Sequence, residues 1–214
     1  MTKRLDHTAK AGARVFIIDD DEHVCKALTR LLTASGLTTE AFHSADDYLR
    51  LEPFDGIGCL ILDIRMPGMS GTDLQTHLNA RNNSIPVIFL TGHGDLPTGI
   101  EAMKRGAVDF LTKPVDEIAL LDAVNRALSS SQTVHDEKSR RADVQARLDT
   151  LTPRELEVLE YIVGGARNKQ IALYLGIHEK TVKAHRGAIM RKMDASSPAE
   201  VGWLCSLVNL TIRK

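Results

Sequence analysis

Four short apolar runs in this chain each end in a side chain that could take part in chemistry. These terminal residues are Asp19 with Asp20, Asp63, Thr91 and Lys113. An apolar run bounded by polar turn residues is typical of a buried strand, which delivers the next residue to the strand's carboxyl end. In open parallel sheets, ligands bind at that edge. If the four strands are parallel, three carboxylates, one hydroxyl and one ammonium group meet there.

Three carboxylates at one edge of a sheet predict a cation among them, because close carboxylates repel one another. Hard oxygen ligands, with water completing the coordination shell, suit Mg²⁺. Lys113 could balance the remaining charge. A plainer interpretation stays open for Asp63, which a turn containing Pro67 and Gly68 follows. Its carboxylate could simply cap that turn or the next helix.

The elements around these residues alternate between strand and helix. We expect strands near residues 14–19, 37–42, 58–63, 86–90 and 108–111. Helices are expected near 21–35, 44–51 and 71–81, with one more ending at Gly106 and another beginning near 116. Five such alternations predict an α/β fold, a doubly wound five-stranded parallel sheet covered by helices on both faces.

Taken in order, Asp19-Asp20, Asp63, Thr91 and Lys113-Pro114 resemble the motif of a response-regulator receiver domain. The resemblance covers about the first 130 residues and implies a CheY/flavodoxin-like fold. It also implies that Asp63 accepts a phosphoryl group.

The same resemblance implies roles for the neighbouring residues. Mg²⁺ would be held by Asp19, Asp20, Asp63 and the backbone carbonyl of Arg65. Thr91 and Lys113 would contact the phosphoryl group, and Phe110 would be the aromatic switch residue. Receiver domains usually have a cis peptide bond before the proline, so the Lys113–Pro114 bond is expected to be cis.

Charge divides the 214-residue chain into two parts. Residues 1–130 carry 13 Lys and Arg against 18 Asp and Glu, a net charge of −5, whereas residues 151–214 carry 10 against 6, a net charge of +4. An acidic first part and a basic last part suggest different partners for the two halves. We therefore expect a disordered tail over 1–12, a receiver domain over 13–129, a helical linker over 130–149 and a second domain over 150–214.

The remaining composition points to the cytoplasm. Cys25, Cys59 and Cys205 are few and far apart, which supports neither a disulfide framework nor a zinc cage. The first residues lack the apolar core of a signal peptide. No stretch reaches the roughly 18 consecutive apolar residues of a membrane span. We expect a cytoplasmic protein without a membrane partner.

The basic last part has the pattern of a helix-turn-helix protein. Thr152-Pro-Arg-Glu155 reads as a capping box with proline at the first helical position. We expect Asn168 to cap a second helix, a third helix to begin near Glu179 after the turn at Gly176, and a fourth to run over 198–208. One stripe of the third helix is basic, with small residues in its middle. A solvated surface is the plainer explanation of that stripe.

This part resembles the LuxR-type output domain of NarL/FixJ response regulators. The matching residues are Leu151-Thr-x-Arg-Glu155, Asn168-Lys-Gln-Ile-Ala172 and Thr181-Val-Lys183-x-His185, with Lys192. The resemblance implies that the third helix enters the major groove of DNA. The implied DNA contacts are Lys169, Lys180, Thr181, Lys183, Ala184, Arg186, Gly187, Arg191 and Lys192.

Within that set the resemblance implies different duties. Lys183 is the best candidate for reading a base, because lysine can donate to guanine O6 and N7, and Ala184 could touch a thymine methyl group. Lys169, Thr181, Arg186 and Lys192 would hold phosphates. Some relatives place a second base-contacting lysine where this chain has Gly187, so their DNA specificity does not carry over.

The expected function is that of a two-component response regulator. A sensor histidine kinase would phosphorylate Asp63, which would promote formation of a homodimer, binding to promoter DNA and regulation of transcription, activation rather than repression, with RNA polymerase as a further partner. One alternative is a phospho-regulated adaptor that no longer reads DNA. Another is a haloacid dehalogenase-like phosphatase, but those enzymes carry a second acid two residues after the nucleophile, where this chain has Arg65. We expect no enzyme activity.

Overall fold

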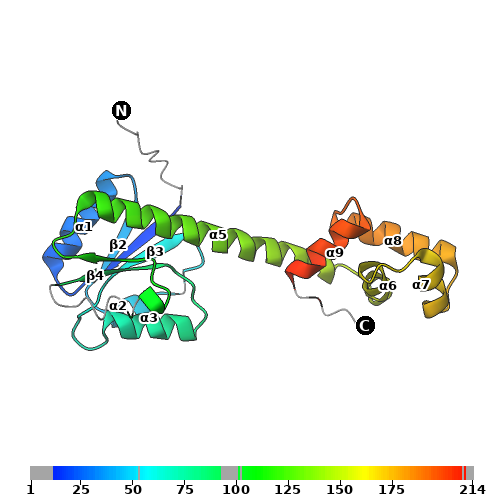
Figure 1. The fold of residues 1–214 in the computed structure, drawn as a ribbon, viewed down its shortest axis with the longest axis horizontal. Helices are drawn as coiled ribbons and strands as arrows, with labels where there is room; N and C mark the ends of the chain where they lie inside the picture. The colour runs from blue at the N-terminus through cyan, green and yellow to red at the C-terminus, as the bar shows by residue number, and fades with distance from the viewer. Residues whose placement is uncertain (1–11, 53, 93–100, 102, 209, 211–214) are drawn as a thin grey trace. The chain divides into compact units, whose positions relative to one another are not determined.

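The chain folds into two compact units, residues 1–135 and 136–214 (Figure 1). A computed structural model describes residues 12–52, 54–92, 101, 103–208 and 210. The boundary between the units falls inside helix α5 (Glu117–Asp149), so the stretch expected to be a helical linker belongs to this helix. Apart from Gly12, the predicted disordered tail lies outside the described residues, as does most of the helix expected before Gly106.

The first unit contains the predicted parallel sheet. Its strands are β1 (Arg14–Ile18), β2 (Thr38–Phe42), β3 (Gly58–Asp63), β4 (Val87–Thr91) and β5 (Asp109–Thr112). All neighbouring strands pair in parallel, in the order β2-β1-β3-β4-β5. This order places the central strand β3, whose six residues are all buried, between β1 and β4. The strand order switches sides at β1, because β2 lies on one side of β1 and β3 on the other, and doubly wound sheets bind ligands at such a switch point.

Helices cover both faces of this sheet. Side chains of α1 (Glu22–Ala34) and the first turns of α5 pack on one face, where Leu28, Leu32 and Leu120 join Ile17 and Ile61 in one apolar cluster. On the other face, α2 (Ala45–Leu49) and α3 (Gly71–Ala80) pack their apolar side chains against alternate residues of the same strands. The strands can serve both clusters because successive side chains of a strand point to opposite faces. The predicted fold class is confirmed.

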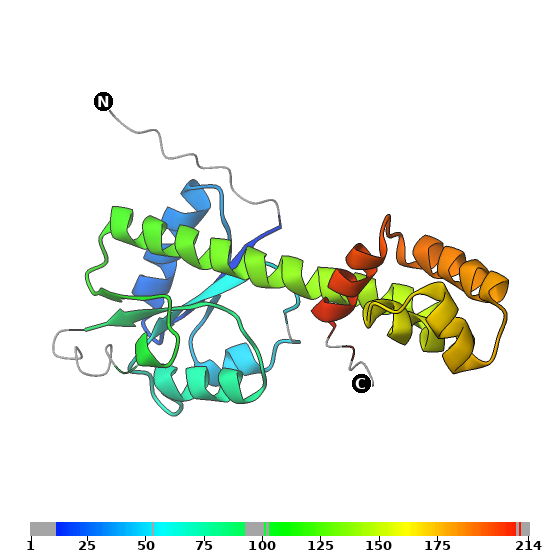
Figure 2. The ribbon, with the colours of Figure 1, turned by 45° about the vertical axis from the view of Figure 1, so that its right-hand side comes forward.

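The second unit consists of helices, as far as the structure describes it. These are α6 (Pro153–Val163), α7 (Asn168–Leu175), α8 (Glu179–Met193) and α9 (Pro198–Leu207), together with the last turns of α5. Their core contains Leu159, Ile171, Val182 and Ile189. In both ribbon views the end of α5 runs into the group formed by these helices (Figures 1 and 2). Four short helices bury enough apolar surface only together, and this explains their shared core.

Local sequence sets the ends of these helices. The Thr152 hydroxyl accepts a hydrogen bond from Glu155 N, and the Glu155 carboxylate accepts one from Thr152 N, which completes the expected capping box of α6. The expectation for α7 was wrong by one residue. Arg167 is its N-cap, Asn168 is the first helical residue, and Gln170 Oε1 accepts from Arg167 N.

Candidate functional site

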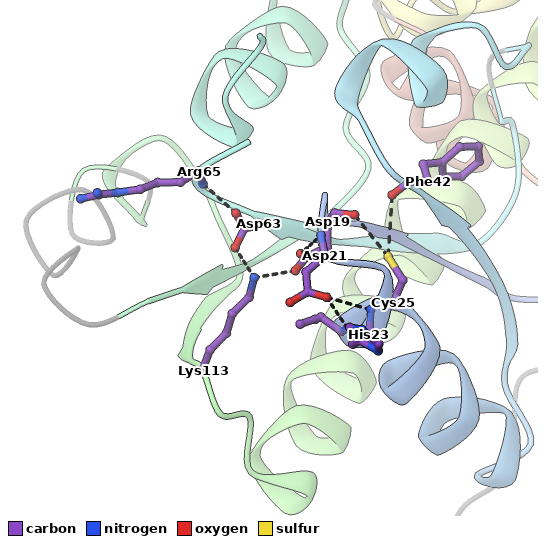
Figure 3. Close-up of polar contacts among 9 residues, drawn as sticks. Asp19, Asp21, His23, Cys25, Phe42, Asp63, Arg65 and Lys113 are labelled. Atoms are coloured by element: carbon purple, nitrogen blue, oxygen red, sulfur yellow. Dashed lines mark hydrogen bonds and ion pairs between the residues drawn. The ribbon is translucent and has the colours of Figure 1, made fainter. Parts of the chain in front are cut away.

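Lys113 joins two carboxylates at the carboxyl edge of the sheet (Figure 3). Its Nζ lies 2.6 Å from Asp19 Oδ2 and 2.6 Å from Asp63 Oδ1. Asp19 directly follows β1 and Asp63 ends β3, and these two strands are neighbours in the sheet. The parallel sheet therefore brings Lys113 to Asp19 and Asp63, which lie 94 and 50 positions before it in the chain.

Backbone groups hold the other oxygen of each carboxylate. Arg65 N donates to Asp63 Oδ2 at 2.9 Å, and Asp21 N donates to Asp19 Oδ1 at 3.0 Å. Asp21 in turn caps α1, because its carboxylate accepts from His23 N at 2.8 Å. The side chain of Arg65 extends away from the carboxylates (Figure 3). Each acid is consequently held at both oxygens, by a backbone N–H on one side and by Lys113 on the other.

The three charged side chains are largely shielded from water, which strengthens the electrostatic interactions among them. The Asp19 side chain is fully buried, that of Asp63 is 7% exposed and that of Lys113 is 25% exposed. Burial raises the pKa of Asp63, and the nearby charge of Asp19 adds to this, while Lys113 acts in the opposite direction. For Lys113, burial lowers the pKa but the two carboxylates outweigh it, so the pKa is raised overall. Lys113 thus stays protonated, and its single positive charge offsets part of the negative charge of the two buried acids.

The other predicted residues of this site lie around this arrangement in different ways. Asp20 is exposed, next to Asp19. Thr91 is buried and its Oγ1 donates to Gly92 O at 3.1 Å; its strand neighbour Leu90 pairs with Asp63. Phe110 is half-buried against the apolar cluster that contains Phe89. The expected cis bond before Pro114 is present. His93 and Gly94, in the glycine-rich stretch after Thr91, lie outside the described residues.

Gly71 is a site residue that the sequence did not reveal. A Cβ at this position would lie 2.2 Å from the carbonyl oxygen of Asp63, closer than any real Cβ approaches an oxygen. Gly71 N also donates to Ile64 O at 3.1 Å, which ties the start of α3 to the residue after Asp63. The available signal was a glycine directly after the N-cap Ser70, a position that has no need of glycine for helix formation.

The donors at this edge suit a hard cation. Among the residues that the structure describes, no three Asp, Glu, His or Cys side chains form a ready-made cage for a metal ion. Mg²⁺ does not need one, since it keeps several waters and uses one or two carboxylates. Asp19 Oδ2 is buried and accepts no hydrogen bond beyond its ion pair with Lys113. A buried carboxylate oxygen of this kind, beside Asp63 and the exposed Asp20, fits Mg²⁺ chemistry.

In the second unit, α7 and α8 form the expected helix pair. Gly176 ends α7 in the left-handed conformation with φ of 62°, where glycine is favoured. Val182, Ile189 and Met193 are buried along one stripe of α8, and His185 on the same stripe is half-buried. The exposed members of the predicted DNA-binding set are Lys169, Lys180, Thr181, Lys183, Ala184 and Arg191, and the half-buried ones are Arg186, Gly187 and Lys192.

The small residues leave room on that exposed stripe. A Cβ at Gly187 would meet no atom closer than the end of the Arg191 side chain at 3.7 Å. Packing inside the protein therefore does not require glycine here, although glycine in a helix costs roughly 1 kcal/mol relative to alanine.

Lys192 has a different environment from the one expected for a phosphate contact. Its Nζ donates to Glu155 Oε2 at 2.7 Å and to Thr150 O at 3.0 Å, and Glu155 is buried. Removing Lys192 would leave a buried carboxylate without its counter-ion, so its first role is structural. Arg186 is partly engaged as well, because its guanidinium donates to Ala166 O at 3.4 Å.

Comparison with known proteins matches both units. Residues 15–125 match the response regulator receiver domain, and residues 149–202 match the bacterial regulatory proteins of the luxR family. This chain belongs to the response regulators with a LuxR-type DNA-binding domain. Such proteins are transcriptional regulators and not enzymes, so the phosphatase alternative is rejected and the DNA-binding interpretation is preferred over the adaptor.

Similar proteins extend over nearly the whole chain. Response regulator protein TodT of Pseudomonas putida is 44% identical over 90% of this chain and 85% of its own length. Transcriptional regulatory protein FixJ of Azorhizobium caulinodans is 44% identical over 87% of this chain and 89% of its own. Among solved structures, the response regulator StyR superposes with a TM-score of 0.83 at 42% identity, covering 92% of this chain and 99% of StyR. In the described part of this response regulator, no helix is both long and apolar enough to cross a bilayer.

The Glu155–Lys192 pair makes the stability of the DNA-binding domain depend on pH. Hydrogen bonds from Lys192 and Thr152 N lower the pKa of Glu155 from 4.5 to about 2. Because the folded pKa is depressed, the stabilisation is complete above pH 4.5 and is lost as the pH falls toward 2. We expect acid to remove about 2 kcal/mol from this domain over that range, and Glu155→Gln to lose this dependence.

Urea unfolding of wild type and Glu155→Gln at pH 7, 5, 4 and 3, followed by circular dichroism, measures this difference. Glu157→Gln is the matched control, since the Glu157 side chain is about half exposed and forms a surface ion pair with Arg154 on α6. The same acid dependence in wild type and Glu155→Gln would show that another group carries it.

Proposed function

We propose that a sensor histidine kinase phosphorylates Asp63 and that this switches the DNA binding of the response regulator. The observation that carries the proposal is the 2.6 Å contact of Lys113 with both Asp63 and Asp19. In the transfer, a bond forms between phosphorus and a carboxylate oxygen of Asp63 while the bond from phosphorus to the kinase histidine breaks. In this proposal Lys113 offsets negative charge on the oxygens of the incoming group, and Thr91 donates its hydroxyl to one of them.

The cation of this site is proposed to be Mg²⁺, held by Asp19, Asp20, Asp63 and the backbone carbonyl of Arg65. When bound, it supplies positive charge that offsets the negative charge of the phosphoryl oxygens. Asp19 and Asp20 orient it, and Arg65 N keeps Asp63 Oδ2 in place. This assignment is supported by the donor chemistry at the sheet edge and by the receiver family match.

The response to phosphorylation is proposed to run through Thr91 and Phe110. The acyl phosphate adds about −1.5 to −2 charges and new acceptor oxygens. Thr91 turns its hydroxyl toward them, away from Gly92 O, and the half-buried ring of Phe110 repacks into the space that Thr91 leaves. The surface around β5 changes, and two molecules associate. A dimer presents two α8 helices to two half-sites of promoter DNA.

In this proposal α8 reads DNA in the major groove and the dimer regulates transcription, as an activator that recruits RNA polymerase. Lys183 and Ala184 contact base edges, while Lys169, Lys180, Thr181, Arg186 and Arg191 contact phosphates. The exposure of all of these side chains except the half-buried Arg186, together with the luxR family match, supports it. Such a regulator acts where the bacterial chromosome lies, in the cytoplasm.

Beryllofluoride with Mg²⁺, a mimic of the phosphoryl group, tests the switch. A DNA duplex selected from a random pool with the mimic-loaded wild type serves as the probe. We expect the mimic to convert monomer to dimer in light scattering and to tighten DNA binding about tenfold, within the usual range of coupling between sites. Asp63→Asn should show neither change. DNA binding that ignores the mimic in both proteins would leave the DNA-binding role standing and remove the switch.

A further inference from the structure

The end of helix α5 belongs to the folded core of the DNA-binding domain. Val144 and Leu148 are 2% and 3% exposed, and they share one apolar cluster with Ile189 and Met193 of α8. Both residues precede position 149, where the luxR family match begins. The DNA-binding domain of this chain is therefore larger than the matched segment, because the end of α5 shares an apolar core with α8.

Polar contacts tie the ends of the two helices to each other. Arg147 Nη1, near the end of α5, donates to Met193 O, the last carbonyl of α8, at 2.9 Å. In return, Lys192 Nζ of α8 donates at 3.0 Å to Thr150 O, in the turn that ends α5. Each helix thus receives a cation from the other at its C-terminal end. Unpaired carbonyls and the negative end of the helix dipole favour a cation at this place.

The hydrogen bond from Arg147 to Met193 O is less exposed to solvent than the ion pairs that Arg147 forms on the surface. Its pairs with Asp143 at 3.9 Å and Asp194 at 3.7 Å involve carboxylates that are 77% and 85% exposed, and such pairs contribute little. The hydrogen bond to Met193 O is partly buried, and the Arg147 side chain is only 34% exposed. The carbonyl contact is therefore the one that constrains α8.

The position of α8 matters for reading bases because the helix acts as a lever. Its 15 residues span about 22 Å at 1.5 Å per residue. The proposed base-reading residues Lys183 and Ala184 lie in its first half, far from the end that Arg147 holds. A tilt of about 5° at the held end moves the other end by about 2 Å along that length. Hydrogen bonds to base edges tolerate displacements of only about 0.5 Å.

We propose that Arg147 is a positioning residue for DNA recognition: through its bond to Met193 O, the end of α5 sets the angle at which α8 meets the bases. Arg147 itself touches no base in this arrangement, and its effect passes through α8. The proposal rests on the assignment of α8 as the DNA-reading helix and goes beyond it, because it makes residues before the matched luxR segment part of the recognition apparatus.

Arg147→Gln in the full-length protein tests the proposal, with Arg147→Lys as the conservative variant. The matched control is Arg140→Gln, which removes an exposed arginine two turns earlier on the same helix. Binding is measured by fluorescence anisotropy on the duplex selected with wild type and on a scrambled duplex of the same composition, over a range of salt concentrations. Circular dichroism checks that each protein is folded at the assay temperature.

We expect Arg147→Gln to lose about tenfold in affinity for the selected duplex, since base contacts are worth that much. Affinity for the scrambled duplex and the salt dependence should stay as in wild type, because no phosphate contact is lost. Arg147→Lys should recover most of the loss, and Arg140→Gln should behave as wild type. If wild type itself prefers neither duplex, the DNA-reading role of α8 is at fault and not the role of Arg147.

Two results would overturn the proposal. A folded Arg147→Gln protein that keeps wild-type affinity for both duplexes would show that the contact does not position α8. An equal loss on both duplexes with a weaker salt dependence would make Arg147 a direct phosphate contact. If Arg147→Gln is not folded, Arg147→Met replaces it, because methionine keeps much of the apolar length of the arginine side chain and removes only the guanidinium that donates to Met193 O. The same loss on the selected duplex alone is then expected, and no loss refutes the proposal.

Discussion

Replacing Lys113 by methionine is expected to destabilise the receiver domain by about 3–5 kcal/mol, the usual effect of leaving buried charges without their partner. Lys113 Nζ lies 2.6 Å from two carboxylates that are almost completely buried. Methionine keeps much of the length of the side chain but removes the charge between Asp19 and Asp63. The two acids then repel one another in a place where water screens them poorly.

Urea unfolding at neutral pH, with and without Mg²⁺, measures the effect. Part of the loss should return with Mg²⁺, because a cation that binds only the folded state stabilises it in proportion to its occupancy. Lys26→Met is the matched control: Lys26 pairs with Glu22 at a similar 2.7 Å, but both side chains are more than 60% exposed. That exposed pair should contribute less than about 1 kcal/mol. Equal losses of unfolding free energy in the two variants would mean that burial does not make the Lys113 contacts stronger than the exposed Lys26–Glu22 pair.

Lys183→Met is expected to weaken binding to the selected DNA duplex by about 10- to 100-fold and to relax the preference for one base pair. Lys183 is exposed on the stripe of α8 opposite the buried Val182, Ile189 and Met193, with the small residues Ala184 and Gly187 beside it. A lysine in this position can donate to guanine O6 and N7. The variant should fold as wild type, because Lys183 is exposed and, among the described residues, is not part of the apolar core.

Lys169→Met provides the comparison, since Lys169 is equally exposed but lies on α7 and is proposed to hold a phosphate. Its loss should weaken binding by the same factor on every duplex and lower the salt slope by about one. Anisotropy measurements on single-base variants of the selected duplex separate the two patterns. If both lysines behave like Lys169, α8 is held over the groove without Lys183 reading a base.

Much of this protein could be predicted because its local sequence patterns agree with its fold. Apolar runs of strand length ended at Asp19, Asp63, Thr91 and Lys113, and parallel pairing then made their convergence a matter of geometry. The Thr152–Glu155 capping box was equally readable, since it involves residues only three positions apart. The predicted start of helix α7 was wrong by one residue, because arginine is not among the residue types that typically mark an N-cap.

Only the tertiary structure decided which lysine and arginine side chains remain exposed for a partner and which bind other groups of the protein. Lys183 and Lys192 are both lysines on α8, but Lys192 is bound to Glu155, 37 positions away. Arg147 belongs to a charged, unremarkable stretch of α5 until its contact with Met193 O, 46 positions away, gives it a role. Gly71 is required only because α3 starts against the backbone of Asp63. Periodicity and capping report neighbours along the chain, whereas these roles depend on contacts that exist only after distant segments pack together.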